Sequence, residues 1–207
     1  MCSNYRPATA ETLQHLGLPP PAFSYAEEVF PQVKAPFLAN SEPETWLEGT
    51  FGLMPHWAEP KLARHTYNAR AETVAQRPSF RHAWRARQLA IIPVLAFYEP
   101  CYETGTAVRW RIQRIDAKAF SLAGLWETRP GAEGKTLYSF TFLTISASDH
   151  PLMQRFHRPK DEKRSVVVVA DADWRAWLTA SDEEAVRGCL KPIDSKQFTA
   201  KASPRDR

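Results

Sequence analysis

The clearest pattern in this chain is a series of strand-like segments in its middle. Leu89–Tyr98 is a continuous run of apolar, β-branched and aromatic residues, which predicts a buried strand. Val108–Ile115 alternates between apolar and polar residues, which is typical of a strand with one buried face. Phe120–Trp126 and Tyr138–Ile145 predict two further strands, and Gly131–Gly134 predicts the turn between them. These segments together predict a sheet.

Shorter elements are predicted on both sides of these strands. Residues 8–18 predict a short helix that ends before three prolines, and the Pro-rich residues 22–45 predict loops with short extended pieces. The other expected elements are a strand over Phe51–Trp57 with a turn at Pro55, helices over Ser79–Arg87, Pro151–Phe156 and Asp171–Leu178, a strand over Val166–Ala170, and a last helix beginning at Ser181. Residues 191–207 are polar and basic, and they predict a flexible tail.

Composition narrows the class of protein only modestly. The 207 residues fit one domain, and a hydrophobic content of 43% is enough for a sizeable core. The net charge of +4 permits an anionic partner, but it is equally typical of a solvated surface, which is how we interpret the basic strand face of Arg109 and Arg111. Three scattered cysteines show no metal-ligand spacing and no disulfide framework, as in a reducing cytosol. No signal pattern and no apolar run of about 18 residues is present, so we expect a cytoplasmic protein without a membrane span or cofactor.

Cys2 has chemistry that an internal cysteine lacks. If Met1 is removed, Cys2 carries a free α-amine and a thiol on adjacent carbons. The amine can condense with an aldehyde to an imine, and the thiol can then close a five-membered thiazolidine ring. Both groups are partly available near neutral pH, because an α-amine titrates near ~8 and a thiol near ~8.5. On this stretch alone, an incidental cysteine at a frayed terminus is the simpler interpretation.

Six short motifs reverse that interpretation, because they occur together and in a fixed order. They are the Cys2 terminus, Gly52–Trp57, Asn68–Thr73, Phe97–Pro100, Ala123–Glu127, and His150–His157 with Arg158-Pro159. In this order they resemble the SOS response-associated peptidase (SRAP) family over most of the chain. The resemblance implies binding to single-stranded DNA and reaction with abasic sites, whose ring-opened sugar exposes a C1′ aldehyde. It also implies a thiazolidine crosslink through Cys2 that shields the lesion, and removal of Met1 by the protein itself.

The resemblance implies roles for three more residues. Asn68 resembles a family asparagine near the α-amine, where an amide can hydrogen-bond the amine or the sugar oxygen without carrying charge. Glu99 ends an apolar strand, where burial would raise its pKa and let it act as a general acid. His157 resembles a family histidine that moves protons or stabilises the 3′ phosphate. Without the motifs these residues would be a turn residue, an exposed strand end and a structural histidine.

Two further residues are candidates for DNA contact. Arg70 resembles the phosphate-binding arginine of the family, because a guanidinium fork suits a phosphate and stays charged. Trp57 could stack on a base or pack in the core, and we give the two interpretations equal weight.

The sequence departs from the family pattern at its other arginines. The family opens Cys-Gly-Arg, whereas this chain has Cys2-Ser3-Asn4, which leaves Arg6 as a candidate replacement. An altered segment after His157 leaves both Arg158 and Arg164 as candidates for the second phosphate ligand. Arg164 is favoured because it keeps the register of the strand that follows.

We therefore expect an α+β fold with a single domain over residues 2–190, in which short helices flank a curved antiparallel, barrel-like sheet around a DNA groove. The expected protein is a monomer that binds single-stranded DNA with abasic sites and, in a bacterium, associates with the nucleoid. Lyase activity should be weak at most, because ring closure by the thiol competes with β-elimination. The alternatives are a peptidase or amidase that uses Cys2 and His157 on other proteins, and a non-catalytic single-strand binder.

Overall fold

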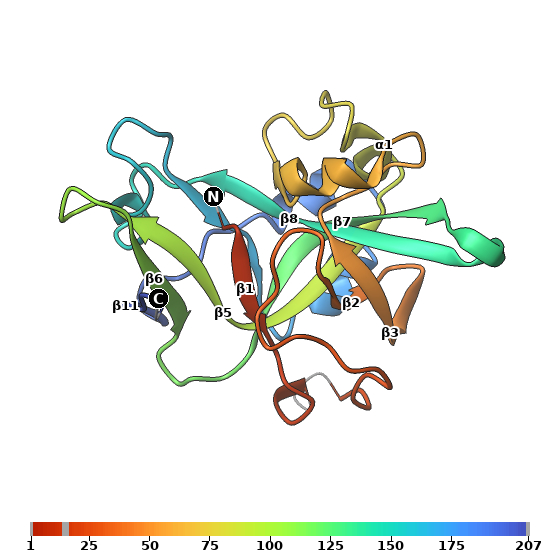
Figure 1. Cartoon of the computed structure of the whole chain (residues 1–207), viewed down its shortest axis with the longest axis horizontal. Coiled ribbons are helices and arrows are strands. Elements are labelled where there is room, and N and C mark those ends of the chain that lie inside the picture. Colours follow the sequence, from red (N-terminus) through yellow and green to blue (C-terminus); the bar gives the residue numbers. More distant parts are fainter. Residues whose placement is uncertain (1, 14–16, 206–207) are drawn as a thin grey trace.

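The computed structural model of the protein describes residues 2–13 and 17–205, and eleven strands of this part form one sheet. The strands are β1 (Asn4–Pro7), β2 (Lys34–Ala39), β3 (Glu42–Phe51), β4 (Asn68–Arg70), β5 (Leu89–Cys101), β6 (Val108–Arg114), β7 (Phe120–Pro130), β8 (Thr136–Ser146), β9 (Arg164–Val166), β10 (Val168–Val169) and β11 (Phe198–Ala202). The helices are short: α1 (Arg81–Arg85), α2 (Trp174–Leu178), α3 (Glu183–Gly188), and the 3-10 turns η2 (Pro60–His65), η3 (Ala132–Gly134) and η4 (Met153–Arg155). Figure 1 shows that strands make up most of the molecule and that the helices lie outside the sheet.

Five of the strands close into a barrel. Strand β5 pairs with β7, β7 with β8, β8 with β3, β3 with β2, and β2 again with β5. All of these pairings are antiparallel except β3–β8, and β4 also runs parallel to β8. The phenyl rings of Phe37, Phe51, Phe140 and Phe142 are fully buried in one cluster, with centroids as close as 4.6 Å for Phe51 and Phe142. Closure leaves no free edge on these strands, and aromatic side chains fill the interior.

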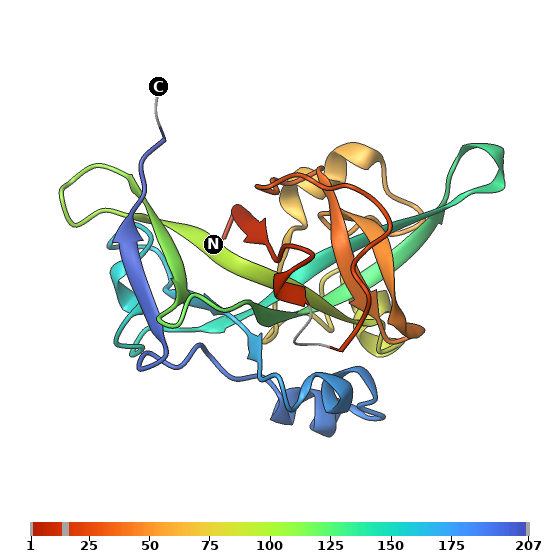
Figure 2. The same cartoon turned by 90° about the horizontal axis from the view of Figure 1, so that it is seen from below.

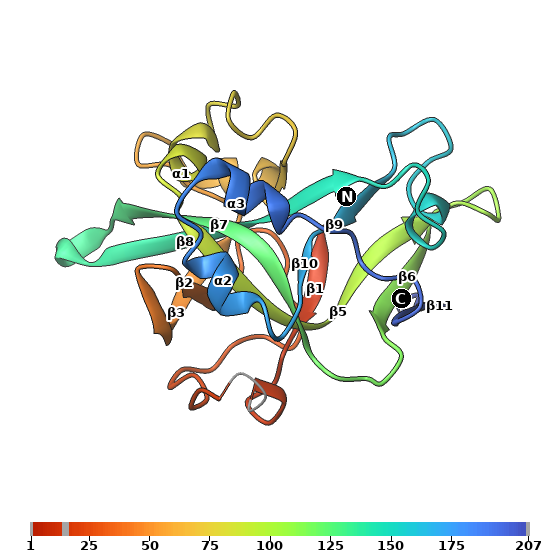
Figure 3. The ribbon, with the colours of Figure 1, turned by 180° about the vertical axis from the view of Figure 1, so that it is seen from behind.

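The outer face of the barrel is also buried. Alternate residues of β5 and β7, such as Ile91 and Leu125, join a second apolar cluster with Trp84 of α1 and Trp177 of α2. Figure 3 shows α2 and α3 lying over this side of the sheet. A strand covered on both faces is apolar at nearly every position, which explains the unbroken hydrophobic run that begins at Leu89.

Strand β5 extends beyond the barrel and carries the rest of the sheet. Its first half pairs with β2 and β7, and its second half pairs with β1 on one side and β6 on the other. Strand β11 continues the sheet beyond β6. The end of β5 therefore lies beside the start of β1, close to the N-terminus (Figure 1).

The predicted α+β single-domain fold with a barrel-like sheet is confirmed, and the four central strands lie where the pattern predicts them. Strands β2 and β3, in contrast, were missed within the Pro-rich segment 22–45 and just after it. The predicted strand over Phe51–Trp57 is wrong, because β3 ends at Phe51 and Gly52 adopts a φ of 116°. A Cβ on Gly52 would lie 2.1 Å from the carbonyl oxygen of Ala63, so this turn requires glycine.

The prediction of a flexible tail over residues 191–207 is wrong for its central part. Phe198–Ala202 forms β11 in register with β6, and the side chains of Ile193 and Phe198 are buried. Residues 206–207, and residues 14–16 of the predicted helix over 8–18, lie outside the described residues. None of the helices in the described part of the chain is both long and apolar enough to span a bilayer.

Candidate active site

Strand β1 fixes the position of Cys2. It pairs with β5 in the register Asn4↔Tyr98 and Tyr5↔Phe97, which brings Cys2 alongside the end of β5. The ring of Tyr5 is fully buried and packs edge-on against the phenyl rings of the barrel, 5.0 Å from Phe142 between centroids. The side chain of Tyr5 therefore anchors the first strand, and Cys2 is itself completely buried.

The amide of Asn68 contacts the backbone of Cys2. Strand β4 runs parallel to β8, with Asn68 opposite Phe142, which directs Asn68 to the N-terminus. Its Nδ2 atom donates a hydrogen bond of 2.7 Å to the carbonyl oxygen of Cys2. The Oδ1 atom of Asn68 is buried and has no hydrogen-bond partner among the described residues. This oxygen is available to accept a hydrogen bond from an amine or a substrate hydroxyl.

Glu99 and His157 form a buried pair beside the same cysteine. The Nε2 atom of His157 lies 3.5 Å from Oε2 of Glu99, and the side chains are 6% and 2% exposed. Burial raises the pKa of Glu99 from 4.5 to about 7 and lowers the pKa of His157 from 6.5 to about 4. Near neutral pH the carboxyl can hold a proton while the imidazole is free of charge, which makes the pair both a donor and an acceptor.

The backbone around His157 is held in an unusual conformation. His157 has a φ of 66°, in the left-handed region that few non-glycine residues adopt. Its N–H donates to the carbonyl oxygen of Pro100 at 2.8 Å, and Phe156 bridges to Cys101. The Nζ atom of Lys163 donates to the carbonyl oxygens of Phe156, His157 and Arg158 at 2.8, 3.2 and 2.9 Å. These bonds offset the strain and fix the imidazole over Glu99.

The thiol of Cys2 is neutral in this environment. Burial, with a further contribution from Glu99, raises the pKa of Cys2 well above its ordinary range. Its Sγ lies 3.3 Å from the carbonyl oxygen of Asn4, so the S–H donates to the backbone. A resting thiolate, which a cysteine peptidase needs as its nucleophile, is disfavoured here.

The candidate arginines fall into two groups. Arg70 is 47% exposed and pairs with Glu162 at 2.7 Å, while the guanidinium of Arg158, also exposed, lies 5.9 Å from the ring centroid of Tyr102. Arg164, in contrast, is 2% exposed. Its guanidinium bonds to Glu72, Glu162 and both oxygens of Thr144. A guanidinium engaged in this way supports the chain between β8 and β9 and presents no free face to a phosphate.

Two of the predicted DNA contacts lie away from the reactive centre. Arg6 is half-buried on β1, in register with Ala96, farther along the strand than Asn4. Trp57 is 57% exposed in the loop before η2, so the interpretation as a core residue is wrong. It lies in a surface depression that also contains Arg81 and Arg85.

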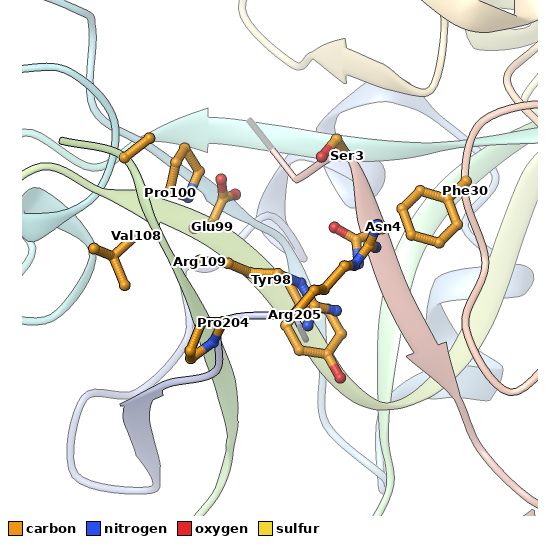
Figure 4. Close-up of a pocket in the computed structure, with 11 residues that line it drawn as sticks. Ser3, Asn4, Phe30, Tyr98, Glu99, Pro100, Val108, Arg109, Pro204 and Arg205 are labelled. Atoms are coloured by element: carbon orange, nitrogen blue, oxygen red, sulfur yellow. The ribbon is translucent and has the colours of Figure 1, made fainter. Parts of the chain in front are cut away.

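A cavity of about 500 Å³, which the sequence did not predict, lies beside Ser3, the residue that follows Cys2. Figure 4 shows its lining, which includes Ser3, Tyr98, Arg109 and Arg205. The basic face of β6 was the only sequence signal for it, and that face is typical of ordinary solvated strands. The contribution of Arg205 depends on the pairing of β11 with β6, which no local pattern reveals.

Comparison with known proteins identifies the family. The family model described as "SOS response associated peptidase (SRAP)" matches residues 1–204. "Abasic site processing protein YoqW" of Bacillus subtilis (strain 168) is 32% identical over 154 residues, which are 72% of this chain and 65% of that protein. The chain thus covers slightly less than two thirds of that relative. "Abasic site processing protein YobE" of the same strain is 33% identical over 154 residues, 72% of this chain and 67% of the relative.

Two solved structures have the same fold. A crystal structure of a protein from Bordetella bronchiseptica is 34% identical, with a TM-score of 0.88 over 99% of this chain and 100% of the other. A crystal structure of a protein from Bacteroides thetaiotaomicron has a TM-score of 0.81 over 97% of this chain and 91% of the other. At 20% identity, the second resemblance is one of fold alone.

Proposed function

Because the chain belongs to the SOS response associated peptidase family, we propose that it processes abasic sites in DNA through a covalent bond to Cys2. Two relatives carry abasic site processing in their names. The observation that carries the proposal is the convergence of four chain segments: Asn68 on the carbonyl of Cys2, and the buried pair of Glu99 and His157 beside it.

The proposed chemistry begins with a free N-terminus. Hydrolysis of the bond between Met1 and Cys2 consumes one water and leaves an α-amine on Cys2. This amine attacks the C1′ aldehyde of the ring-opened abasic sugar, and loss of one water gives an imine. The thiol then adds across the C=N bond, sulfur bonding to carbon while the proton moves to nitrogen. Amine, thiol and aldehyde thus yield a thiazolidine and one water.

The surrounding side chains fit the proton transfers that these steps need. Glu99, with a pKa of about 7, donates a proton to the departing hydroxyl and, earlier, to the ring oxygen of the sugar as it opens. His157, uncharged at neutral pH, accepts a proton from the amine or the thiol. Asn68 holds the backbone of Cys2 in place and offers its Oδ1 to the amine.

The same groups support removal of Met1 by the protein itself. Hydrolysis of a peptide bond needs a base for water and an acid for the leaving amine, and the pair of Glu99 and His157 can supply both. We propose that the neutral, buried thiol favours ring closure over β-elimination, so that strand cleavage is at most a minor outcome.

The DNA is proposed to be single-stranded and to pass over the exposed arginines near the site. Arg70 lies two residues after Asn68 on the same strand, and Arg158 directly follows His157. Both can bind phosphate with a planar fork. Arg164 is assigned a positioning role, because its guanidinium is buried between Glu72 and Glu162.

Intact-mass measurement tests the proposal. The purified protein is mixed with a single-stranded oligonucleotide that contains one abasic site. The expected product has the summed mass of the chain without Met1 and the oligonucleotide, less one water, and it survives denaturation. The Cys2→Ser variant should form only an imine that borohydride can trap, and the Cys2→Ala variant should behave in the same way. A stable adduct with Cys2→Ala, or a chain that keeps Met1 and still reacts, would overturn the proposal.

A further inference from the structure

The cavity beside Ser3 is built from parts of the chain that are distant in sequence. Ser3 and Asn4 line it from the start of β1 and the residue before it, Tyr98 and Glu99 from β5, and Arg109 from β6. Pro204 and Arg205 enter from the segment after β11, because Ala202 of that strand pairs with Trp110 of β6. Figure 2 shows the C-terminal segment leaving the sheet on the side opposite the blue helices α2 and α3. Because Ser3 and Asn4 directly follow Cys2 in the chain, they connect the cavity to the reactive cysteine.

One carboxylate oxygen in this region receives three donors. The Oε1 atom of Glu28 accepts hydrogen bonds from Asn4, from Arg109, and from Arg205 at 2.9 Å. The side chain of Glu28 is 31% exposed, and the two guanidiniums carry one more charge than it neutralises. Three converging donors with a net positive charge form a site for an anion, and an acidic side chain of the chain itself fills it.

Both guanidiniums also lie on aromatic rings. The guanidinium carbon of Arg109 is 3.4 Å from the ring centroid of Tyr98, and that of Arg205 is 4.4 Å from the ring centroid of Phe30. Figure 4 shows the two arginines and the ring of Tyr98 gathered along one wall of the cavity. Planar cations held over rings provide flat surfaces on which a nucleobase can stack.

We propose that this cavity binds the nucleotide next to the abasic site, with Arg109 and Arg205 as ligands of its phosphodiester. The inference rests on the proposed function and extends it to a second contact region. The phosphodiester takes the place that the carboxylate of Glu28 holds in the free protein, and Glu28 swings toward solvent. A volume of about 500 Å³ accommodates a nucleotide-sized ligand, and the cavity opens beside Ser3, the residue that follows Cys2.

Binding is best measured without reaction. A single-stranded oligonucleotide with a tetrahydrofuran in place of the abasic sugar has no aldehyde and cannot form a crosslink. Its dissociation constant is measured at low and at moderate salt for Arg109→Gln and Arg205→Gln, and each variant is expected to lose roughly fivefold in affinity. The slope of log K against log salt should fall by about 0.7 for each lost phosphate contact.

Arg175→Gln is the matched control. Arg175 also pairs with a glutamate, Glu44 at 3.5 Å, and also covers an aromatic ring, that of Trp174 at 4.5 Å. It lies on α2, and Figure 2 shows that helix on the side of the sheet opposite the C-terminal segment, which carries Arg205. The affinity of the Arg175→Gln variant for the oligonucleotide, and the salt dependence of that affinity, should equal those of the unaltered protein. Equal losses for Arg175→Gln and Arg205→Gln would overturn the inference.

Two further measurements separate this inference from the proposed function and from misfolding. Reaction with free 2-deoxyribose, an aldehyde without phosphate, should be unchanged in Arg109→Gln and Arg205→Gln. If these variants lose reactivity toward 2-deoxyribose as well as affinity for the oligonucleotide, the two arginines support the fold and do not bind the phosphodiester. If the unaltered protein forms no crosslink, the proposed function is wrong. The inference about the cavity is still tested in that case, because the binding measurement uses an oligonucleotide that cannot react.

The Glu28→Gln variant tests the exchange of anions. Removing the competing charge should tighten oligonucleotide binding by roughly fivefold at low salt. Weaker binding would show that Glu28 is needed in place and would overturn the exchange.

A free deoxynucleoside monophosphate is the last probe. If it binds as tightly as the oligonucleotide and the arginine variants lose only that binding, the cavity is a site for free nucleotides and the inference is wrong.

Discussion

The imidazole of His157 lies 3.5 Å from the carboxyl of Glu99, and burial moves the two pKa values in opposite directions. Each group disfavours its charged form, since water no longer solvates it. The carboxyl therefore tends to keep a proton and the imidazole tends to lose one. Two neighbouring groups with such complementary pKa values are suited to donating and accepting protons in successive steps of one reaction.

Glu99→Gln should lose activity and gain stability at alkaline pH. The amide cannot donate a proton as an acid, so the crosslinking rate at pH 7 should fall about 10²-fold. Because the folded-state pKa of about 7 lies above the ordinary 4.5, the stability that Glu99 contributes is greatest below pH 4.5 and is lost as pH rises through 7. The variant avoids this loss, which amounts to about 3 kcal/mol.

Denaturant unfolding at pH 5 and pH 8, with single-turnover crosslinking at pH 7, measures both effects. The advantage of Glu99→Gln over the unaltered protein should be larger at pH 8 than at pH 5. A variant that is less stable at pH 8 would show that the charged carboxylate is favourable in the folded protein. The Glu103→Gln variant is a control, because Glu103 is an exposed residue near the same strand end.

His157→Asn should remove a stability loss at acidic pH. The folded-state pKa of about 4 lies below the ordinary 6.5, so the stability that the neutral imidazole provides is present above pH 6.5 and is lost as pH falls through 4. Asparagine tolerates the left-handed backbone at φ 66°, so the change does not disturb the loop.

The comparison is made in the Glu99→Gln background, where the opposing titration of the carboxyl is absent. Unfolding free energies at pH 7 and pH 4.5 should differ by about 2–3 kcal/mol more when His157 is present than when asparagine replaces it. Equal pH dependence in the two proteins would mean that folding does not lower the pKa of His157, which would contradict the folded-state value of about 4.

Much of the fold follows from local pattern, but the barrel does not. The run that begins at Leu89 predicts a strand because it is apolar throughout. The segment that begins at Val108 predicts a strand because apolar and polar residues alternate, as in a strand with one solvent-exposed face. Lys34–Ala39 and Glu42–Phe51 contain prolines and glutamates, and they become strands only because β5 and β8 offer them pairing partners. Pairing between segments distant in sequence is what the pattern of a single segment cannot show.

The candidate site was likewise predictable in part. The structure brings Cys2, Asn68, Glu99 and His157 together, and each carried a motif in the sequence. The difference in burial between Arg158 and Arg164 could not be predicted, because register along a strand says nothing of burial. Arg164 is enclosed by Glu72 and Glu162, and those partners are visible only in three dimensions.

Arg70→Gln should weaken DNA binding, and Glu162→Gln should strengthen it. Arg70 is half-exposed, and the carboxylate of Glu162, 2.7 Å away, competes with phosphate for its guanidinium. Loss of one phosphate contact lowers the salt slope by about 0.7, whereas removal of the competing carboxylate frees the guanidinium. Fluorescence anisotropy with the unreactive tetrahydrofuran oligonucleotide measures both. If both variants bind like the unaltered protein, Arg70 has no part in DNA binding.

Arg164→Met should destabilise the fold. Methionine has a similar length but no donors, so the buried oxygens of Thr144 and the more exposed carboxylate of Glu72 lose their partner. The expected cost is about 3 kcal/mol in the free energy of unfolding. Arg158→Gln, by comparison, removes an exposed side chain and should leave the free energy of unfolding almost unchanged. Urea unfolding measures the difference, and equal stability of the two variants would leave Arg164 without a structural role.

Trp57→Ala should affect DNA binding far more than stability. The indole is 57% exposed, so its removal uncovers little core and should change the free energy of unfolding by about 0.5 kcal/mol or less. Stacking of one base on an aromatic ring is worth about 1–3 kcal/mol, and the depression that holds Trp57 also contains Arg81 and Arg85 for the adjoining phosphates. Trp57→Phe is the matched control, because it keeps a ring for stacking and should retain most of the affinity. A series of oligonucleotide lengths then locates the contact, since only strands long enough to reach from Cys2 to Trp57 should lose affinity in Trp57→Ala. If affinity is unchanged at every length, the indole does not touch DNA, and its exposure must have another cause.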